Sequence, residues 1–497
     1  MTQETTDKLR RCFEAMAVFK DLTQTSLFKT LGLPSFMRDW LLQKFENSDG
    51  VFDAGEMISF VHEYIPKHDD WTHIKDRIVV GYERVKMLAK IVVNIDVVTG
   101  EVTFSLPDFG LRNRETMIDA DVWDKCRGKL ASGHETWGMM ELGYRPPDDT
   151  ARPKVPGKIK LLSFRDFCPY EIDLDYYKDV RKEFSIQEWI DIVLGAVDYK
   201  AEGYDAARKE NAELPDPQTM KLTMLSRVLP FAEKRLNLME LAPMGTGKSY
   251  LFGQVSRYGW LSTSDKMTRA KLFYDAGRRE PGLVGQNDFI VLDEIQKTIF
   301  EEGMGSVMQG YLEQGTFSVG NYSSSADSGF VLCGNIAPEI MKQDGYAYMF
   351  ANLPRLFQDA AMIDRFHGFI KGWNIPRMNS TLKIDGWALN SEYFTAILHQ
   401  LRDDSSYRHV VDELIEVPSG SDERDTEAVK RLATALLKLL FPNVRTPADV
   451  SEKDFQRYCF RPAMKMRYTI RYQMGLMNEQ YRGKDLPALK IRNGMAE

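Results

Sequence analysis

The sequence predicts an α/β core that follows a helical and then a β-rich amino-terminal region, with further helices after the core. Three observations support this prediction. Residues 236–380 alternate strand patterns with helical patterns, as α/β domains do. Residues 76–170 contain short runs of β-branched and aromatic side chains separated by turn residues. Residues 1–75 and 381–445 instead place apolar side chains at helical spacing.

The amino-terminal region is predicted to contain two units. Residues 1–75 are expected to form a helical subdomain, because SLFKTLGLPSFMRDWLLQKFE and DAGEMISFVHEYI both follow the helical apolar period. Residues 76–170 hold the strand patterns MLAKIVVNIDVV, TGEVTFSLP, WGMMELGY and KIKLLSF. Roughly five strands in such a short span suit a small barrel, and we expect an OB-fold-like one.

Two helical segments flank the predicted core. Residues 171–235 are expected to be a helical linker, in which Ser185 is an N-cap and Glu188 occupies the capping-box position. Residues 381–445 are expected to be a helical lid, and DTEAVKRLATALLKLLFP is its clearest element.

The last residues, 446–497, are predicted to form a basic tail. The whole chain has a net charge of −7, yet ten Lys or Arg residues face three Asp or Glu residues between Lys453 and Arg492. Aromatic side chains are interleaved with these cations in FQRYCFRPAMKMRYTIRYQ. This composition suits a nucleic-acid contact and equally a subunit interface with the acidic body.

Composition also indicates where the protein works. Of 497 residues, 43% are hydrophobic and 28% are charged, which is ordinary for a globular protein. There is no uninterrupted apolar run long enough for a membrane span, and the first residues do not resemble a secretory signal. The five cysteines are scattered and form no CxxC pair. We therefore expect a cytoplasmic protein without a membrane partner.

The strongest motif is LMELAPMGTGKSY, in which an apolar strand enters a Gly-rich loop and leaves it as a helix. Backbone N–H groups of such a loop surround phosphates. Lys248 is expected to reach the β- and γ-phosphates of ATP, and the Ser249 hydroxyl to bind Mg²⁺. Ala242 replaces the usual first glycine, and the alternative is a Gly-rich turn that happens to precede Lys-Ser. The predicted nucleotide-binding residues of the loop are Pro243, Met244, Gly245, Thr246, Gly247, Lys248 and Ser249.

A second motif, DFIVLDEIQ, predicts a buried parallel strand that ends in two carboxylates. We expect this strand beside the loop strand, with Asp293 joining Ser249 at Mg²⁺. Glu294 is expected to orient and deprotonate the attacking water. A carboxylate pair at a strand end is by itself weak evidence for a nucleotide site. At 45 residues after a phosphate loop it is strong evidence for one.

A third motif, GFVLCGNI, predicts another buried strand, which ends in Asn335. The Asn335 amide could hold the attacking water or the γ-phosphate, and the alternative is a turn residue at a strand end. Strand–loop–helix, strand–Asp–Glu and strand–Asn in this order are the marks of an AAA+ ATPase.

Membership of that superfamily would imply further site residues. AAA+ proteins form rings in which an arginine of one subunit reaches the γ-phosphate of the next, and Arg365 in AAMIDRFHGFI is our candidate. Its alternative role is an intrasubunit salt bridge with Asp364 or Asp359. A basic residue of the lid often contacts the same nucleotide, and either Lys430 or Arg431 could do so.

Beyond these motifs, the chain resembles the Lon-like AAA+ family of BREX phage-defence systems, the BrxL family. The stretches that carry the resemblance are FKDLT, FSIQEWIDIVL, VLPFAEKRLNLMELAPMGTGKS, LFYDAGRREPGLVGQNDFIVLDE, YLEQGTFSVGN and IDRFHGFIKGWNIPRM. They lie between about residue 10 and about residue 445. The core order and the IDRFH arginine are similar, more distantly, to those of minichromosome-maintenance (MCM) helicases.

The resemblance implies a homo-oligomeric ring, a hexamer or a stacked dodecamer, that uses ATP and Mg²⁺ and takes double-stranded DNA and other defence proteins as partners. Two departures limit it. Only 55 residues follow Pro442, too few for the family's Lon-type protease domain, so we expect no protease activity. The hairpin before Asn335 carries Asn321 and Tyr322 where the family has a basic residue, which weakens a phosphate contact there.

The function that these features favour is a ring-forming ATPase that binds or translocates on double-stranded DNA in antiviral defence. The DNA-contact candidates of the barrel are Lys86, Lys90, Arg112 and Arg114, and those of the hairpin are Asn321 and Tyr322. The alternatives are a protein remodeller or assembly scaffold that does not touch DNA, and a nucleotide-switched structural barrel with slow turnover.

Overall fold

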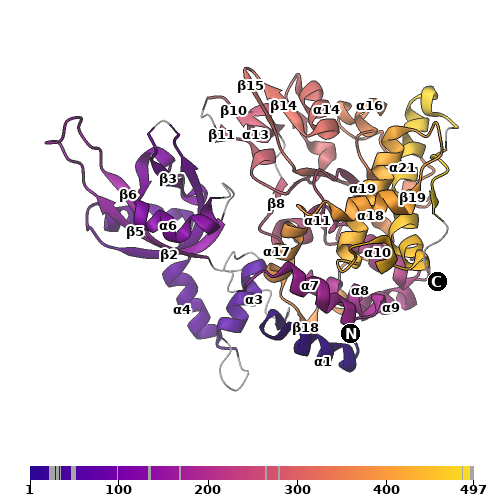
Figure 1. Ribbon diagram of the computed structural model, residues 1–497, viewed down its shortest axis with the longest axis horizontal. Coiled ribbons are helices and arrows are strands. Elements are labelled where there is room, and N and C mark those ends of the chain that lie inside the picture. Colours follow the sequence, from indigo (N-terminus) through magenta and orange to yellow (C-terminus); the bar gives the residue numbers. More distant parts are fainter. Residues whose placement is uncertain are drawn as a thin grey trace. The chain divides into compact units, whose positions relative to one another are not determined.

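A computed structural model describes residues 1–21, 28, 33, 35–45, 52–97, 99–131, 136–166, 170–262, 266–277, 280–483 and 485–492. The chain divides into two compact units (Figure 1). Unit 1 contains Met1–Thr30, Pro34–Asp39 and Ile172–Glu497, and unit 2 contains Leu31–Leu33 and Trp40–Glu171. In the part of the chain that is described, no helix is long and apolar enough to cross a membrane.

Unit 2 is built on a five-stranded sheet with the order β3-β2-β5-β6-β4. Its strands pair in antiparallel fashion except for β4 and β6, which are parallel. The Thr116 hydroxyl and the Phe104 backbone exchange hydrogen bonds, which links β4 to β3. The elements are α4 (Ala54–Tyr64), α5 (Trp71–Val79), β2 (Val85–Ile95), β3 (Val102–Ser105), β4 (Thr116–Ile118), α6 (Ala120–Leu130), β5 (Thr136–Arg145) and β6 (Lys158–Asp166).

Alternation along these strands explains the core of unit 2. On β2, for example, Met87, Ala89, Ile91 and Val93 are buried at every second position and face one apolar cluster. Ile78 of α5 and Leu130 of α6 complete that cluster from the helices. A sheet with its own enclosed core makes this unit a domain in its own right.

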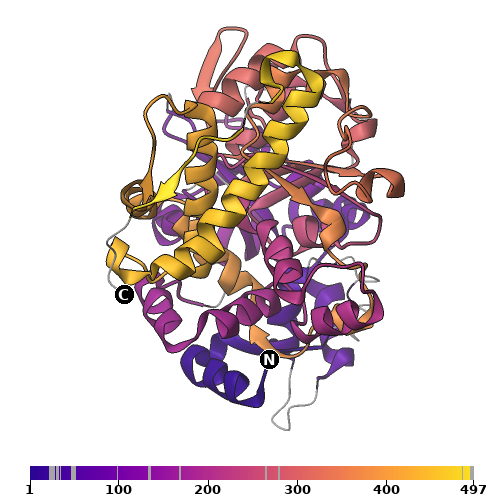
Figure 2. The same ribbon diagram turned by 90° about the vertical axis from the view of Figure 1, so that its right-hand side faces the viewer.

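Unit 1 centres on a second five-stranded sheet, with the order β17-β7-β16-β12-β8. Every pairing in it is parallel. Its three inner strands are buried except at Asn335, and apart from Glu240 and Asn335 their residues are apolar or glycine, as expected where helices cover both faces of a parallel sheet (Figures 1 and 2). The strands are β7 (Leu238–Ala242), β8 (Gly259–Ser262), β12 (Phe289–Leu292), β16 (Gly329–Asn335) and β17 (Gly368–Lys371).

Helices from both ends of the chain surround this sheet. The earlier ones are α1 (Gln3–Phe13), α7 (Leu174–Val180), α8 (Ile186–Ala196), α9 (Glu202–Glu210), α10 (Pro217–Ser226) and α11 (Leu229–Ala232). The later ones are α12 (Lys248–Gln254), α13 (Arg269–Leu272), α14 (Met304–Gln314), α15 (Pro338–Met341), α16 (Ala360–Ile363), α17 (Ser391–Leu401), α18 (Ser406–Leu414), α19 (Glu423–Leu440), α20 (Glu452–Asp454) and α21 (Arg461–Met477). Ser185 is the N-cap of helix α8, and its side chain forms the expected capping box with Glu188.

Short two-stranded pairings complete unit 1. They are β1 (Ala17–Asp21) with β18 (Asp385–Leu389), β9 (Lys266–Met267) with β13 (Ile299–Phe300), β10 (Tyr274–Asp275) with β11 (Glu280–Pro281), β14 (Thr316–Val319) with β15 (Tyr322–Ser325), and β19 (Ile415–Glu416) with β20 (Lys490–Ile491). The β14–β15 pair is the predicted hairpin, and Gly320 at its turn has a φ of +60°.

The boundary between the two compact units differs from the predicted domain boundaries. Residues 1–75 were expected to be one helical subdomain, but β1 pairs with β18, which places the first residues in unit 1. Helix α3 (Ser35–Lys44) crosses from unit 1 to unit 2 after Asp39. Long-range strand pairing of this kind leaves no mark in the local apolar period that the prediction used.

The predicted basic tail is a folded part of unit 1. Helix α21 lies beside α19 in both ribbon views (Figures 1 and 2). Arg467 of α21 is fully buried, and its guanidinium donates to the carboxylates of Asp425 and Asp364 at 2.7 and 2.5 Å. Part of the positive charge therefore neutralises acidic side chains of the same chain, whereas Arg457, Arg461 and Lys465 are exposed.

Candidate nucleotide-binding site

The loop between β7 and α12 has the backbone of a phosphate-binding loop. Gly245 and Gly247 adopt left-handed φ angles of +82° and +81°, which glycine tolerates and other residues rarely adopt. A Cβ atom on Gly247 would lie 2.5 Å from the Tyr199 hydroxyl, so this position also lacks space for a side chain. The exposed Met244 and the buried Thr246 complete the loop.

Lys248 and Ser249 begin helix α12 directly after the loop. The Lys248 side chain is buried, yet among the described residues its ammonium has no hydrogen bond or ion pair. A buried cation without a partner is costly unless an anion completes the site. The structure thus fits a phosphate beside Lys248.

Ser249 meets the first carboxylate of the second motif. Its hydroxyl donates to Asp293 Oδ2 at 2.6 Å, and Asp293 directly follows β12. Hydroxyl and carboxylate oxygens are the ligands that Mg²⁺ prefers. The residues present therefore fit the predicted Mg²⁺ site.

The predicted strand neighbours are wrong in one respect. We expected the strand before Asp293 to lie beside the loop strand, but β16 lies between β7 and β12. Asp293 still meets Ser249, because the carboxyl ends of parallel strands meet at one edge of the sheet. Strand order is a long-range property that the two motifs alone do not determine.

Glu294 stands in a conformation that is unusual for a residue other than glycine. Its φ is +50°, and its backbone N–H donates to Asp293 Oδ1 at 2.9 Å. The Glu294 carboxylate accepts a hydrogen bond from Lys297 at 2.8 Å, and both side chains are more than half exposed. Glu294 thus combines an unusual backbone conformation with a side chain that solvent can reach.

Asn335 is the last residue of β16, the strand between the loop strand and the carboxylate strand. Gln296 ties it to the carboxylate motif: the Gln296 amide donates to the Asn335 carbonyl at 2.8 Å, and the Asn335 N–H donates back at 3.4 Å. The Asn335 side chain is exposed. Gln296 lies in DFIVLDEIQ, so a polar residue soon after the two carboxylates was the signal that could have identified it.

Arg227 supports the phosphate loop through Thr246, and it lies outside the sequence motifs of the site. Its guanidinium is fully buried against Glu240 of β7, with Nη2 2.5 Å from Oε1. It also donates to the carbonyl and the hydroxyl of Thr246, at 2.7 and 3.1 Å. Burial alone would lower the pKa of Arg227, but the Glu240 carboxylate outweighs it and raises that pKa, so the pair stays charged.

A second buried ionic cluster lies behind helix α12. Tyr250, the residue after Ser249, donates to Asp198 at 2.6 Å and accepts from Arg38 at 3.1 Å. Arg38 also pairs with Asp39 and Asp198, both at 2.8 Å, and Lys20 pairs with Asp198 at 2.9 Å. The cluster fixes the amino-terminal segment against helix α12. No local sequence motif predicts these contacts.

Arg365 is held within its own subunit in this structure. Its guanidinium donates to Glu313 of α14 at 2.7 Å and to the Ala361 carbonyl. The Glu313 carboxylate also accepts from Arg424 at 2.8 Å, and these two cations hold its pKa below the usual value, Arg424 more strongly than Arg365. The ion pair is thus intrasubunit, but its partner is neither Asp364 nor Asp359. The role of Arg365 between subunits stays a prediction.

The two lid candidates are both engaged with acidic side chains. Lys430 donates to Asp412 of α18 at 2.7 Å. Arg431 donates to Glu427 at 2.9 Å and to the Lys234 carbonyl at 3.1 Å. These partners lie outside the phosphate loop, and a nucleotide contact by either residue stays a prediction.

The hairpin candidates have different surroundings. Asn321 is exposed at the turn. Tyr322 is half-buried and stacks on Tyr274 of β10, with ring centroids 3.7 Å apart and an interplanar angle of 9°. Its ring face is therefore shared with another tyrosine of the same chain.

The barrel candidates lie on unit 2. Lys86, Arg112 and Arg114 are exposed. Lys90 is half-buried, 3.4 Å from the Asp108 carboxylate and near the Trp137 ring. An ion pair at Lys90 competes with any phosphate contact there.

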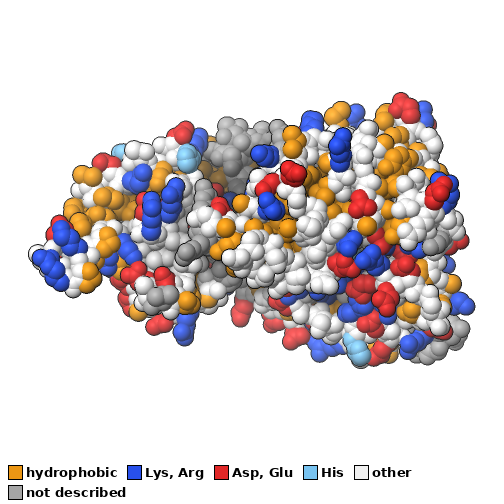
Figure 3. Space-filling view, turned by 90° about the horizontal axis from the view of Figure 1, so that it is seen from above, with side chains coloured by type: hydrophobic (Ala, Val, Ile, Leu, Met, Phe, Trp, Pro, Cys, Tyr) orange, Lys and Arg blue, Asp and Glu red, His pale blue; other side chains and the backbone are white. Residues whose placement is uncertain are grey.

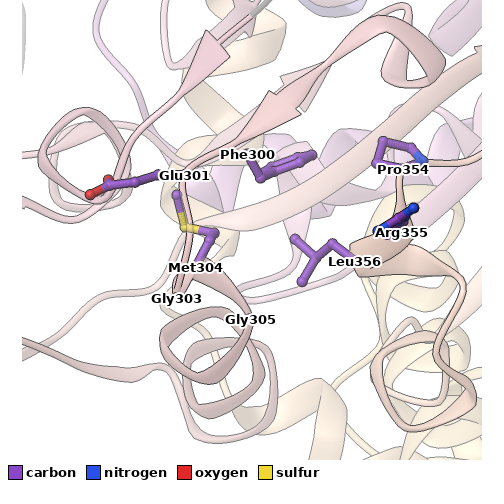
Figure 4. Close-up of a pocket in the computed structure, with 8 residues that line it drawn as sticks. All are labelled: Phe300, Glu301, Gly303, Met304, Gly305, Pro354, Arg355 and Leu356. Atoms are coloured by element: carbon purple, nitrogen blue, oxygen red, sulfur yellow. The ribbon is translucent and has the colours of Figure 1, made fainter.

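A cavity of about 420 Å³ lies elsewhere in unit 1 (Figure 4). Phe300, Met304 and Leu356 give it apolar walls, and Arg355 lies at its side. None of its lining residues belongs to the nucleotide site.

Comparison with known proteins identifies the family. The model of the Lon-like protease BrxL-like ATPase domain matches residues 159–486, which is more than half of the chain. The chain belongs to the BrxL-like family. The model of the BrxL amino-terminal domain, described as that of a BREX system Lon protease-like protein, matches residues 11–144.

Two curated proteins named Lon-like protease BrxL are similar to this BrxL-like chain. The protein of Escherichia coli O9:H4 (strain HS) is 26% identical over 473 residues, which cover 94% of this chain and 64% of that protein. The protein of Bacillus cereus (strain H3081.97) is 30% identical over 442 residues, which cover 88% and 62%. The chain therefore spans less than two thirds of the length of these relatives.

The nucleotide site lies within residues 159–486, the range that the model of the BrxL-like ATPase domain matches. The relatives are named proteases, and a Ser–Lys pair is one form of protease nucleophile and base; in this chain Ser391 and Lys20 form a Ser–Lys contact. Lys20 lies 2.8 Å from the Ser391 hydroxyl, but it is fully buried and also bound to Asp198 and two backbone carbonyls. This contact is structural.

Proposed function

We propose that this BrxL-like chain hydrolyses ATP with Mg²⁺ at the site between β7, β12 and β16. The observation that carries the proposal is the buried Lys248, which has no partner among the residues that the structure describes, next to the Ser249–Asp293 contact. The loop backbone of residues 243–247 and the Lys248 ammonium hold the phosphates. Ser249 and Asp293 hold Mg²⁺, which when bound neutralises phosphate charge.

The remaining polar groups act on the attacking water. Glu294 accepts its proton, and the exposed side chain supports that role because solvent can reach it. The Asn335 amide orients the water or the γ-phosphate. Gln296 holds Asn335 in register with the carboxylate strand.

We further propose that the ATPase is an AAA+ ring, a hexamer or a stacked dodecamer, in which Arg365 reaches the neighbouring subunit's ATP. The likeness to MCM helicases in core order and in IDRFH supports this assignment. Residues 381–445 are the proposed helical lid. Assembly must then exchange the Arg365–Glu313 pair for a contact with phosphate.

Subunit mixing tests the ring. Arg365→Ala is expected to lose ATP hydrolysis and keep nucleotide affinity, because the arginine acts on another subunit's site. Mixing it with Glu294→Gln is expected to restore part of the hydrolysis, since some interfaces then combine an intact arginine with an intact base. Steady-state ATPase rates of the two variants and their mixtures measure this.

Arg424→Ala is the matched control, because Arg424 donates to the same Glu313 carboxylate. It removes an ion pair from Glu313 and should retain hydrolysis. If subunits exchange and the mixture recovers nothing, Arg365 acts within its own subunit.

We propose double-stranded DNA as the partner of the ring, in bacterial antiviral defence. Unit 2 supports this because its five strands, with β3 linked to β4 through Thr116, fit an OB-fold-like barrel, a fold that binds nucleic acid. On the face shown in Figure 3, basic and acidic side chains are interspersed. DNA must therefore be held by local cations such as Arg112 and Arg114.

The salt dependence of DNA affinity tests that contact. Each neutralised phosphate contributes about 0.9 to the slope of log affinity against log salt. Arg112→Ala with Arg114→Ala is expected to reduce the slope by up to about two units, without sequence preference. Fluorescence anisotropy of a labelled duplex with an ATP analogue gives the slope.

Lys125→Ala with Lys129→Ala removes the same charge from exposed positions of α6 and is the control. An equal reduction in the control would show a general charge effect instead of a contact. Absence of salt-sensitive DNA binding in the parent protein would exclude the DNA-binding proposal.

A protein remodeller or assembly scaffold is the second candidate. It is favoured by the hairpin, in which Tyr322 stacks on Tyr274 and the turn residues Gly320 and Asn321 carry no charge. The net charge of −7 also suits a protein partner better than a polyanion.

A further inference from the structure

The segment after β17 brings a cation to the phosphate loop that no sequence motif identified. The Met378 N–H donates to the Gly245 carbonyl at 2.8 Å, which fastens this segment to the loop. The Arg377 guanidinium lies against the same glycine: a Cβ atom on Gly245 would be 3.4 Å from Arg377 Nε and 3.6 Å from Nη2.

Local structure fixes the segment on both sides of Arg377. Before it, Ile375 and Pro376 are buried. After it, the Asn379 side chain accepts from the N–H groups of Thr381 and Leu382 and closes a turn. Arg377 therefore leaves a rigid backbone next to Gly245.

Arg377 is available for a ligand. The side chain is exposed, and within the described part of the chain its guanidinium makes no hydrogen bond or ion pair. The two lid candidates, Lys430 and Arg431, are instead paired with Asp412 and Glu427. Arg377 and Lys248 are thus two unpaired cations at one loop.

The strand order of the sheet determines on which side of the phosphate loop Arg377 lies. Strand β17 pairs with β7 on the side opposite to β16. Asn335 ends β16 and Asp293 follows β12, both on the β16 side of β7, whereas Arg377 comes after β17. A nucleotide in the loop would lie between these two sets of side chains, where the strand connections leave in opposite directions.

We propose that Arg377 binds the nucleotide of its own subunit and holds the phosphates that ATP and ADP share. A guanidinium is suited to this role because its planar donors match phosphate oxygens. The inference rests on the proposed nucleotide site and adds to it a residue acting from the β17 side.

Affinity for both nucleotides tests the proposal. Arg377→Ala is expected to weaken binding of ADP and of a nonhydrolysable ATP analogue alike, by about 10- to 100-fold, the range for a lost hydrogen bond to a charged group. Isothermal titration with each nucleotide measures this. Arg355 of unit 1 is also exposed and its guanidinium has no hydrogen bond or ion pair to any described residue, so Arg355→Ala should bind as the parent does. Unchanged affinity in Arg377→Ala, or a loss for the ATP analogue alone, would overturn the proposal.

Two further variants separate the possible failures. Arg377→Ala could lower the thermal midpoint of the protein without nucleotide, and Arg377→Gln is then the variant that tests nucleotide binding, because it keeps most of the side-chain length without the charge. Lost nucleotide affinity in Arg377→Gln supports the proposal, and parental affinity overturns it. Lys248→Ala reports on the site itself. If Lys248→Ala also binds as the parent does, the proposed nucleotide site is wrong; if only Arg377→Ala does, this inference alone is wrong.

Discussion

Glu294→Gln is expected to bind ATP and to stall before hydrolysis. The amide keeps the size of the side chain but cannot accept the proton of the attacking water. Loss of a general base lowers rates by roughly 10²- to 10⁴-fold. The Ser249–Asp293 contact does not involve Glu294, so binding should persist. ATPase rates and titration with ATP measure the two steps separately.

Lys248→Ala is expected to lose ATP binding, the step before hydrolysis, because it removes the buried cation that we propose holds the phosphates. Glu302→Gln makes the same carboxylate-to-amide change at an exposed position and should hydrolyse ATP at the parental rate. Parental hydrolysis by Glu294→Gln would show that another group acts as the base.

The local parts of the site could be predicted from the sequence. Gly245 and Gly247 need left-handed backbone angles, and a strand must deliver Asp293 to the edge where Ser249 lies. Each of these requirements restricts residue types within a few positions, so a short motif records it. The capping box at Ser185 was predictable for the same reason.

The supporting parts of the site could not be predicted in this way. Arg227 lies 13 residues before its partner Glu240, and Arg377 lies far along the chain from Gly245. Such contacts depend on which strands become neighbours, and the order β17-β7-β16-β12-β8 differs from the one that the motifs suggested. The pairing of β1 with β18, which moved the first residues into unit 1, is a long-range contact of the same kind.

The buried pair of Arg227 and Glu240 is expected to have the largest effect on stability. Arg227→Ala leaves the Glu240 carboxylate buried without its cation and removes both donors to Thr246. Breaking a buried ion pair from one side costs about 3–5 kcal/mol. The thermal midpoint of the protein without nucleotide should fall clearly, and ATP affinity should fall with it.

A double variant separates stability from support of the loop. Arg227→Met with Glu240→Met replaces both charges by apolar side chains of similar length, and such replacements are often neutral or stabilising. Most of the thermal stability should return. ATP affinity should stay low, because Thr246 still lacks the donors that fix the loop between Gly245 and Gly247. If the double variant regains parental affinity, Arg227 serves only to neutralise Glu240, and the phosphate loop holds its shape without it.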